Sequence, residues 1–162
     1  ELGSKALTKD EFDILLKSKN DFYLDSIKEL NQSDLLPGVL DLLSESKAKG
    51  IKLAVGSSSK NAHLILRLLK IDHLFNVVID GNMVEFPKPH PEVFLNAAKA
   101  LAFSPSECIV FEDAESGLKA AKAGGFIAFG VGNPKIAKLV PFLLIVPINF
   151  FVLNYIVFKK KT

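Results

Sequence analysis

From residue 51 to residue 131, short apolar runs alternate with segments of helical periodicity. The apolar runs, which we predict to be buried strands, are residues 51–56, 76–80, 108–111 and 126–131. The segments between them, which we predict to be helices, are residues 61–70, 91–103 and 115–123. Apolar strands joined by helices are typical of a parallel sheet that is covered by helices on both faces. The sequence therefore predicts an α/β fold.

Two further helices are predicted before the first strand. Residues 10–30 keep apolar side chains at a spacing of three and four, and residues 39–50 do the same up to Gly50, a typical helix end. The connector between them, residues 31–38 (NQSDLLPG), is rich in turn formers. We place the internal boundary of the chain in this connector.

Composition excludes several classes of protein. Charged residues make up 23% and hydrophobic residues 49%, which suits a globular domain with a sizeable core rather than a disordered chain. The net charge of +2 is too small to indicate a nucleic-acid partner. The single cysteine and the absence of a signal-peptide pattern at the N-terminus favour a cytoplasmic protein.

The segment 140–158 has no charged residue and is followed by three lysines. It reaches the roughly 20 residues that a membrane span needs, but prolines and asparagines interrupt it. We favour a segment that does not span a membrane, with one more strand at 143–146. Its apolar character leaves open an association with another chain or with a lipid surface.

Polar side chains with distinctive chemistry follow the predicted strands. Residues 57–61 (Ser-Ser-Ser-Lys-Asn) offer hydroxyls, helix-start amides and a cation, which suit an anion. Lys88 is flanked by prolines that restrict the backbone, so its ammonium could neutralise a phosphate. Glu112 and Asp113 end a buried strand and are the hard oxygen ligands that suit Mg²⁺. In an open α/β sheet, function gathers at these carboxyl ends.

Each of these features also has a purely structural interpretation. A serine at 57–61 could simply cap the following helix, and Lys88 could be a solvated side chain on a rigid loop. Acidic residues at a helix start are stabilised by the helix dipole. This explains Glu115 better than it explains Glu112 and Asp113. Together, however, the three strand ends carry what phosphoryl transfer needs, namely positioning and charge neutralisation.

The motifs P-K-P-x-P-x-x-F at 87–94 and F-E-D-x-x-S-G at 111–117 resemble those of the haloacid dehalogenase superfamily. Within it, Leu-Pro-Gly at 36–38, Gly-Ser-Ser-Ser-Lys-Asn at 56–61 and Val-Gly-Asn-Pro at 131–134 resemble the β-phosphoglucomutases. The resemblance implies a Rossmann-like core with a helical cap. Residues 1–33 would then be part of the cap, and residues 34–162 would form the core, which in this family would close with a strand at 143–146 and a helix at 149–159.

The resemblance also implies a role for each matching residue. The transferring phosphate would be held by Ser57, Ser58 and Lys88. A Mg²⁺ cofactor would be bound by Glu112 and Asp113. The distal phosphate of a sugar-phosphate substrate would be gripped by Ser59, Lys60 and Asn61, and Lys19 of the cap would contact the substrate.

The family's first motif, Asp-x-Asp at the end of a central strand, occurs nowhere in the sequence. In the family its first Asp is the nucleophile that forms an aspartyl-phosphate, and its second is the general acid and base. We therefore expect an N-terminally truncated chain that is inactive alone, because covalent catalysis needs its nucleophile. We also expect two strands beside the missing one to expose unpaired edges.

Three hypotheses for the function remain open. The intact protein would be a β-phosphoglucomutase-like enzyme that interconverts β-glucose 1-phosphate and glucose 6-phosphate with Mg²⁺. It would alternatively be a phosphatase of a small sugar phosphate. The third hypothesis is a non-catalytic remnant that binds a phosphorylated sugar or associates through its apolar tail.

Overall fold

The computed structural model describes residues 7–131 and the backbone of residues 155–158. The helices α1 to α5 are Lys9–Ile27, Val39–Ala48, Ala62–Leu68, Glu92–Ala100 and Glu115–Ala123. The strands β1 to β5 are Leu53–Gly56, Val77–Ile79, Cys108–Glu112, Ile127–Gly130 and Tyr155–Phe158. Up to β4, every element predicted from the periodicity is present, with its ends within a few residues of the prediction.

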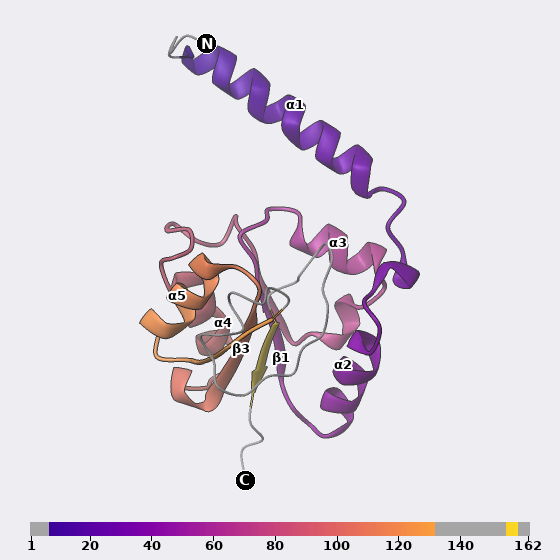
Figure 1. Cartoon of the computed structure of the whole chain (residues 1–162), viewed down its shortest axis with the longest axis vertical. Coiled ribbons are helices and arrows are strands. Elements are labelled where there is room, and N and C mark those ends of the chain that lie inside the picture. Colours follow the sequence, from indigo (N-terminus) through magenta and orange to yellow (C-terminus); the bar gives the residue numbers. More distant parts are fainter. Residues whose placement is uncertain (1–6, 132–154, 159–162) are drawn as a thin grey trace.

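The strands form one sheet in the order β2-β1-β5-β3-β4. The pairs β1–β2 and β3–β4 are parallel, as predicted, and β5 is antiparallel to both of its neighbours, β1 and β3. The described chain is therefore an α/β fold with parallel strand pairs and helices on both faces, which confirms the predicted fold class (Figure 1).

Two expectations for the C-terminal region are wrong. The closing helix at 149–159 is contradicted by β5, whose Tyr-Ile-Val-Phe sequence consists of aromatic and β-branched residues that favour a strand. The expected open edges are also absent from the described strands, because β5 pairs with β1 and β3 on its two sides. The predicted strand at 143–146 lies outside the described residues.

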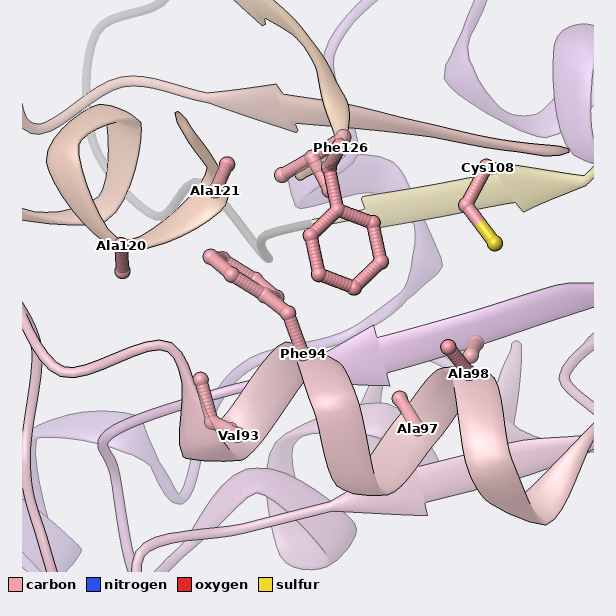
Figure 2. Packing of buried hydrophobic residues seen from close by; sticks show 10 residues of the cluster. Val93, Phe94, Ala97, Ala98, Cys108, Ala120, Ala121 and Phe126 are labelled. Carbon is pink, nitrogen blue, oxygen red and sulfur yellow. The ribbon is translucent and has the colours of Figure 1, made fainter. Parts of the chain in front are cut away.

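Two apolar clusters cover opposite faces of β1. Ala54 belongs to a cluster with α4, α5 and β3, whereas its neighbours Leu53 and Val55 pack with residues of α2 and α3. Since successive side chains of a strand point to opposite faces, these helix pairs lie on opposite sides of the sheet. In the first cluster, the ring of Phe94 on α4 contacts the ring of Phe126 edge-on, with centroids 6.0 Å apart (Figure 2).

Helix α1 lies outside the two layers of the body (Figure 1). Its start is capped by Thr8 and Glu11, which exchange hydrogen bonds in a capping box. Its end is anchored by Ile27, which is buried in the cluster with α2 and α3, while Phe12 and Phe22 are exposed. Among the helices in the described part of the chain, none combines the length and the apolar character needed to cross a membrane.

Candidate active site

A buried ion pair joins two of the predicted strand ends. The Nζ atom of Lys88, from the loop before α4, lies 2.8 Å from Oε2 of Glu112 at the end of β3. The same ammonium donates a hydrogen bond of 3.1 Å to the carbonyl of Gly56, the last residue of β1. It also lies 4.5 Å from the ring centroid of Phe94, a distance at which a cation–π attraction operates. Lys88 thus connects the ends of β1 and β3 with helix α4.

Burial sets the electrostatics of this pair, because the side chains of Lys88 and Glu112 are only 6% and 1% exposed. Desolvation lowers the pKa of Lys88, and the charges of Glu112 and Asp113 oppose that shift. Desolvation raises the pKa of Glu112, and the attraction of Lys88 together with the hydrogen bond from the Ala114 N–H opposes it. Each of the two side chains therefore stays charged in the buried site mainly because of the opposite charge of its partner.

Two backbone features hold the Glu112 carboxylate. The N–H of Ala114 donates to its Oε1 at 3.1 Å, which satisfies the oxygen that Lys88 does not contact. A Cβ atom added at Gly117, in the first turns of α5, would overlap Cδ and Oε2 of Glu112. Gly117 is thus needed for α5 to pack directly against the buried carboxylate, and this contact explains the glycine in F-E-D-x-x-S-G.

The serine-rich loop begins at the end of β1. Ser57 is buried, its N–H donates to the carbonyl of Ile79 on β2, and its Oγ accepts from the N–H of Ser59. The Oγ of Ser59 in turn accepts from the N–H of Asn61. These local bonds give the loop a defined shape, whereas Ser58 and the side chain of Lys60 are exposed.

The predicted metal ligands lie at the same place. Asp113 is half-buried, follows Glu112 directly and adds its negative charge beside Lys88. In the described ranges 7–131 and 155–158, no group of three or more His, Cys, Asp or Glu side chains is arranged to hold a metal ion. Two carboxylates are nevertheless the protein ligands that Mg²⁺ commonly uses, with phosphate and water completing its shell. The donor set therefore fits this ion.

The structure brings some predicted site residues together and separates others. Ser57, Lys88, Glu112 and Asp113 converge at the carboxyl ends of β1 and β3. Ser59, Lys60 and Asn61 follow in the adjoining loop, where the Asn61 side chain donates to the Asn20 side chain of α1 at 3.3 Å. The side chain of Lys19 is exposed, and its link to the site is that it precedes Asn20 on α1.

Sequence reasoning missed several contributors to this site. The ring of Phe94 ends the motif P-K-P-x-P-x-x-F, so its position was visible, but nothing in the pattern indicated that it lies beneath the ammonium of Lys88. The contacts of the Gly56 carbonyl with Lys88 and of Asn20 with Asn61 join segments far apart in sequence, which one sequence does not reveal, and the close approach of Gly117 to Glu112 depends on the packing of α5.

Comparisons with known proteins find relatives over most of this chain. Residues 3–125 match the family model described as haloacid dehalogenase-like hydrolase. The chain is 42% identical over 126 residues to a β-phosphoglucomutase of Bacillus subtilis, covering 78% of this chain and 56% of the relative. It is 34% identical over 102 residues to a fructose-1-phosphate phosphatase of Escherichia coli, covering 63% of this chain and 54% of the relative.

A solved structure is similar over a comparable range. The crystal structure of a β-phosphoglucomutase from Clostridium difficile superposes with a TM-score of 0.77 at 36% identity, covering 82% of this chain and 59% of the other. The chain therefore spans little more than half the length of each of these three proteins.

Proposed function

Since the chain belongs to the haloacid dehalogenase-like hydrolases, we propose that it supplies the phosphate-binding and metal-binding part of an enzyme that transfers the phosphoryl group of a sugar phosphate. The specific reaction that we propose for the intact protein is the Mg²⁺-dependent interconversion of β-glucose 1-phosphate and glucose 6-phosphate. The match to a β-phosphoglucomutase at 42% identity supports this choice. Residues 1–33 would belong to a cap and residues 34–162 to the core.

The observation that carries the proposal is the buried ion pair beside the serine loop. The Lys88 ammonium contacts the carbonyl of Gly56 at the end of β1, and the Ser57 hydroxyl follows directly, so a phosphate placed there would find a fixed positive charge and a hydroxyl donor. A fixed ammonium in a buried site stabilises charge that develops during transfer without reorganising. Lys88, Ser57 and Ser58 would thus hold the transferring phosphate.

The remaining residues would bind the metal and the other end of the substrate. Glu112 and Asp113 would hold Mg²⁺, which when bound would neutralise phosphate oxygens. Ser59, Lys60 and Asn61 would hold a distal phosphate, with Lys19 contributing charge from α1. No Asp-x-Asp occurs in the 162 residues, so we expect ligand binding but no turnover by this chain.

Titration calorimetry with Mg²⁺ and inorganic phosphate tests the site in the chain as it is. We expect binding of phosphate that depends on Mg²⁺, and we expect Asp113→Asn to remove the dependence on the metal. The matched control is Asp72→Asn, which removes an exposed carboxylate at the start of a short helix away from the site. Phosphate binding that is unaffected by Asp113→Asn would contradict the carboxylate assignment.

A phosphatase is the second candidate, and the match to a fructose-1-phosphate phosphatase favours it. A chain completed with a strand that ends in Asp-x-Asp would distinguish the two reactions. Formation of glucose 6-phosphate from β-glucose 1-phosphate supports the mutase, whereas release of inorganic phosphate without isomerisation supports the phosphatase. If the chain binds the sugar phosphate but the completed chain performs neither reaction, a binding role is left.

A further inference from the structure

The loop that carries Lys88 is closed by a carboxylate at its end. Glu92, the first residue of α4, accepts two hydrogen bonds from backbone N–H groups at the start of the loop. The N–H of Glu85 donates to Oε1 at 3.0 Å, and the N–H of Phe86 donates to Oε2 at 2.8 Å. Each oxygen takes one of the two bonds, so the side chain joins residue 92 to residues 85 and 86. Lys88 lies between the two points that this contact brings together.

The prolines of the loop make this contact important. The prolines at 87, 89 and 91 have no backbone N–H, so residues 85–91 offer only the four donors of residues 85, 86, 88 and 90. Two of the four donate to Glu92, and a third, the N–H of His90, donates to the carbonyl of Pro87 at 3.0 Å. The Glu92 carboxylate therefore receives half of the backbone hydrogen bonds that this loop can donate.

A carboxylate in the first turn of a helix is usually explained by capping or by the helix dipole. Capping would direct the carboxylate at N–H groups of α4 itself, whereas the two oxygens of Glu92 bind the preceding loop. The N–H groups of Glu85 and Phe86 also lower the pKa of the Glu92 carboxyl, so it is ionised at neutral pH. Glu92 is thus a charged acceptor that is used to hold the loop.

The two ends of the Lys88 side chain are held from different places. Its ammonium contacts Glu112, the Gly56 carbonyl and the ring of Phe94. Its Cα atom belongs to the loop that Glu92 closes. Lysine has a flexible stem of four carbons, so contacts at the ammonium alone do not fix the backbone behind it. Because residues 92 and 94 both belong to α4, this helix sets the loop and the ring beneath the ammonium together.

We propose that Glu92 is a positioning residue that closes the loop of residues 85–92 and thereby holds the Lys88 ammonium in place at the ends of β1 and β3. The positioning is a property of the chain without any ligand. The statement that the positioned ammonium binds the phosphate of a substrate rests on the proposed function. Loss of Glu92 should therefore loosen Lys88 and, as a consequence, weaken phosphate binding.

Two measurements without any ligand test the positioning in Glu92→Gln, which loses one acceptor and the charge. We expect the N–H groups of Glu85 and Phe86 to exchange with solvent about 10-fold faster, the usual value of a hydrogen bond to a charged group. We also expect an amine-modifying reagent to label Lys88, whose side chain is 6% exposed, about 2- to 10-fold faster. Peptide mapping by mass spectrometry measures the labelling of Lys88 separately from that of the other lysines.

Two control variants separate this role from a general loss of stability. Glu85→Gln changes an exposed carboxylate of the same loop and keeps both N–H groups. Leu43→Val lowers stability from the apolar cluster formed with α2 and α3, away from the loop. Both controls should leave the exchange at residues 85 and 86 and the labelling of Lys88 unchanged. The proposal would be overturned by unchanged exchange in Glu92→Gln, by faster exchange without faster labelling of Lys88, or by equally fast labelling in Leu43→Val.

Titration calorimetry with inorganic phosphate and Mg²⁺ tests the consequence for binding. We expect Glu92→Gln to weaken phosphate binding about 2- to 10-fold and Glu85→Gln to leave it unchanged. Wild-type affinity in Glu92→Gln would overturn the role of Glu92 in the site. If the wild-type chain does not bind phosphate, the proposed function is wrong, and the labelling of Lys88 alone decides the positioning.

Discussion

The buried pair of Lys88 and Glu112 offers the most quantitative test of the site. With the charges 2.8 Å apart, an effective dielectric constant of about 20 gives an attraction of about 6 kcal/mol. The cost of desolvating two ions offsets most of this attraction, so the intact pair adds little net stability. Removing one partner is different, because it leaves an unpaired charge in a buried site.

We expect Lys88→Met and Glu112→Gln each to lower the free energy of unfolding by roughly 3–5 kcal/mol, the usual cost of breaking a buried pair from one side. For a chain of this size that corresponds to a fall in Tm of roughly 6–20 °C. The double variant should lose less than the sum of the single variants, with a coupling of about 1–3 kcal/mol, because no unpaired charge remains.

Urea unfolding followed by circular dichroism measures all three variants. Lys119 and Glu115 provide the control, since they form an ion pair of the same residue types at 2.7 Å on the exposed surface of α5. Screening by water should leave that pair without measurable coupling in the equivalent Met and Gln variants. Additive losses for Lys88 and Glu112 would refute the argument that each charge depends on its partner.

The same reasoning predicts how pH affects Lys88→Met. Burial raises the pKa of Glu112 above its unfolded value, and loss of Lys88 removes the attraction that opposes this shift. A group whose folded pKa is raised stabilises the fold fully below its unfolded pKa, near 4.3, and that contribution is lost as the pH rises toward the folded pKa. The variant should therefore recover stability as the pH falls from 8 toward 5, and a deficit independent of pH would contradict this.

Three further predictions concern the surroundings of the pair. Gly117→Ala should displace the Glu112 carboxylate and destabilise the fold by about 1–3 kcal/mol in urea unfolding, although alanine normally favours a helix. The control is Ser116→Ala at an exposed position of the same helix, which should increase stability. A similar increase for Gly117→Ala would contradict the overlap between the added Cβ atom and the Glu112 carboxylate. Burial raises the pKa of the Cys108 thiol to about 12, so the thiol should resist a disulfide reagent at pH 8 until urea unfolds the chain. The stability that the buried neutral thiol contributes should be lost as the pH rises from about 8.5 toward 12. Rapid labelling of the folded chain would contradict the burial of Cys108. Ile156→Pro removes a backbone donor from the middle of β5 and should lower the Tm and cause aggregation measurable by light scattering. The control Ile156→Val should leave the Tm and the monomeric state unchanged. A proline variant that remains monomeric with an unchanged Tm would contradict the pairing of β5 with its two neighbours.

The sequence predicted those parts of the fold that depend on local patterns. The amphipathic spacing of α4 and α5 and the apolar runs of β1 and β3 follow from burial on one helix face or on both strand faces. Their order along the chain was enough to predict a covered sheet and to place functional side chains at the strand ends. The sequence could not predict which end would contact which, because the distance of 2.8 Å between Lys88 and Glu112 depends on how the loop before α4 crosses the sheet.

The position of β5 shows where reasoning from a family pattern and reasoning from the residues themselves diverge. The family pattern predicted a helix at 149–159, whereas Tyr155 to Phe158 are side chains with strand propensity. The expectation of unpaired edges is wrong, because β5 pairs with β1 and β3 and so removes a row of N–H and C=O groups that would be costly or prone to aggregation if left unpaired. What could not be deduced is which segment pairs with these strands. Strand β5 is separated from β3 by the 42 residues 113–154, and it pairs through backbone hydrogen bonds, which any extended segment can form. Side-chain patterns therefore select this segment only weakly.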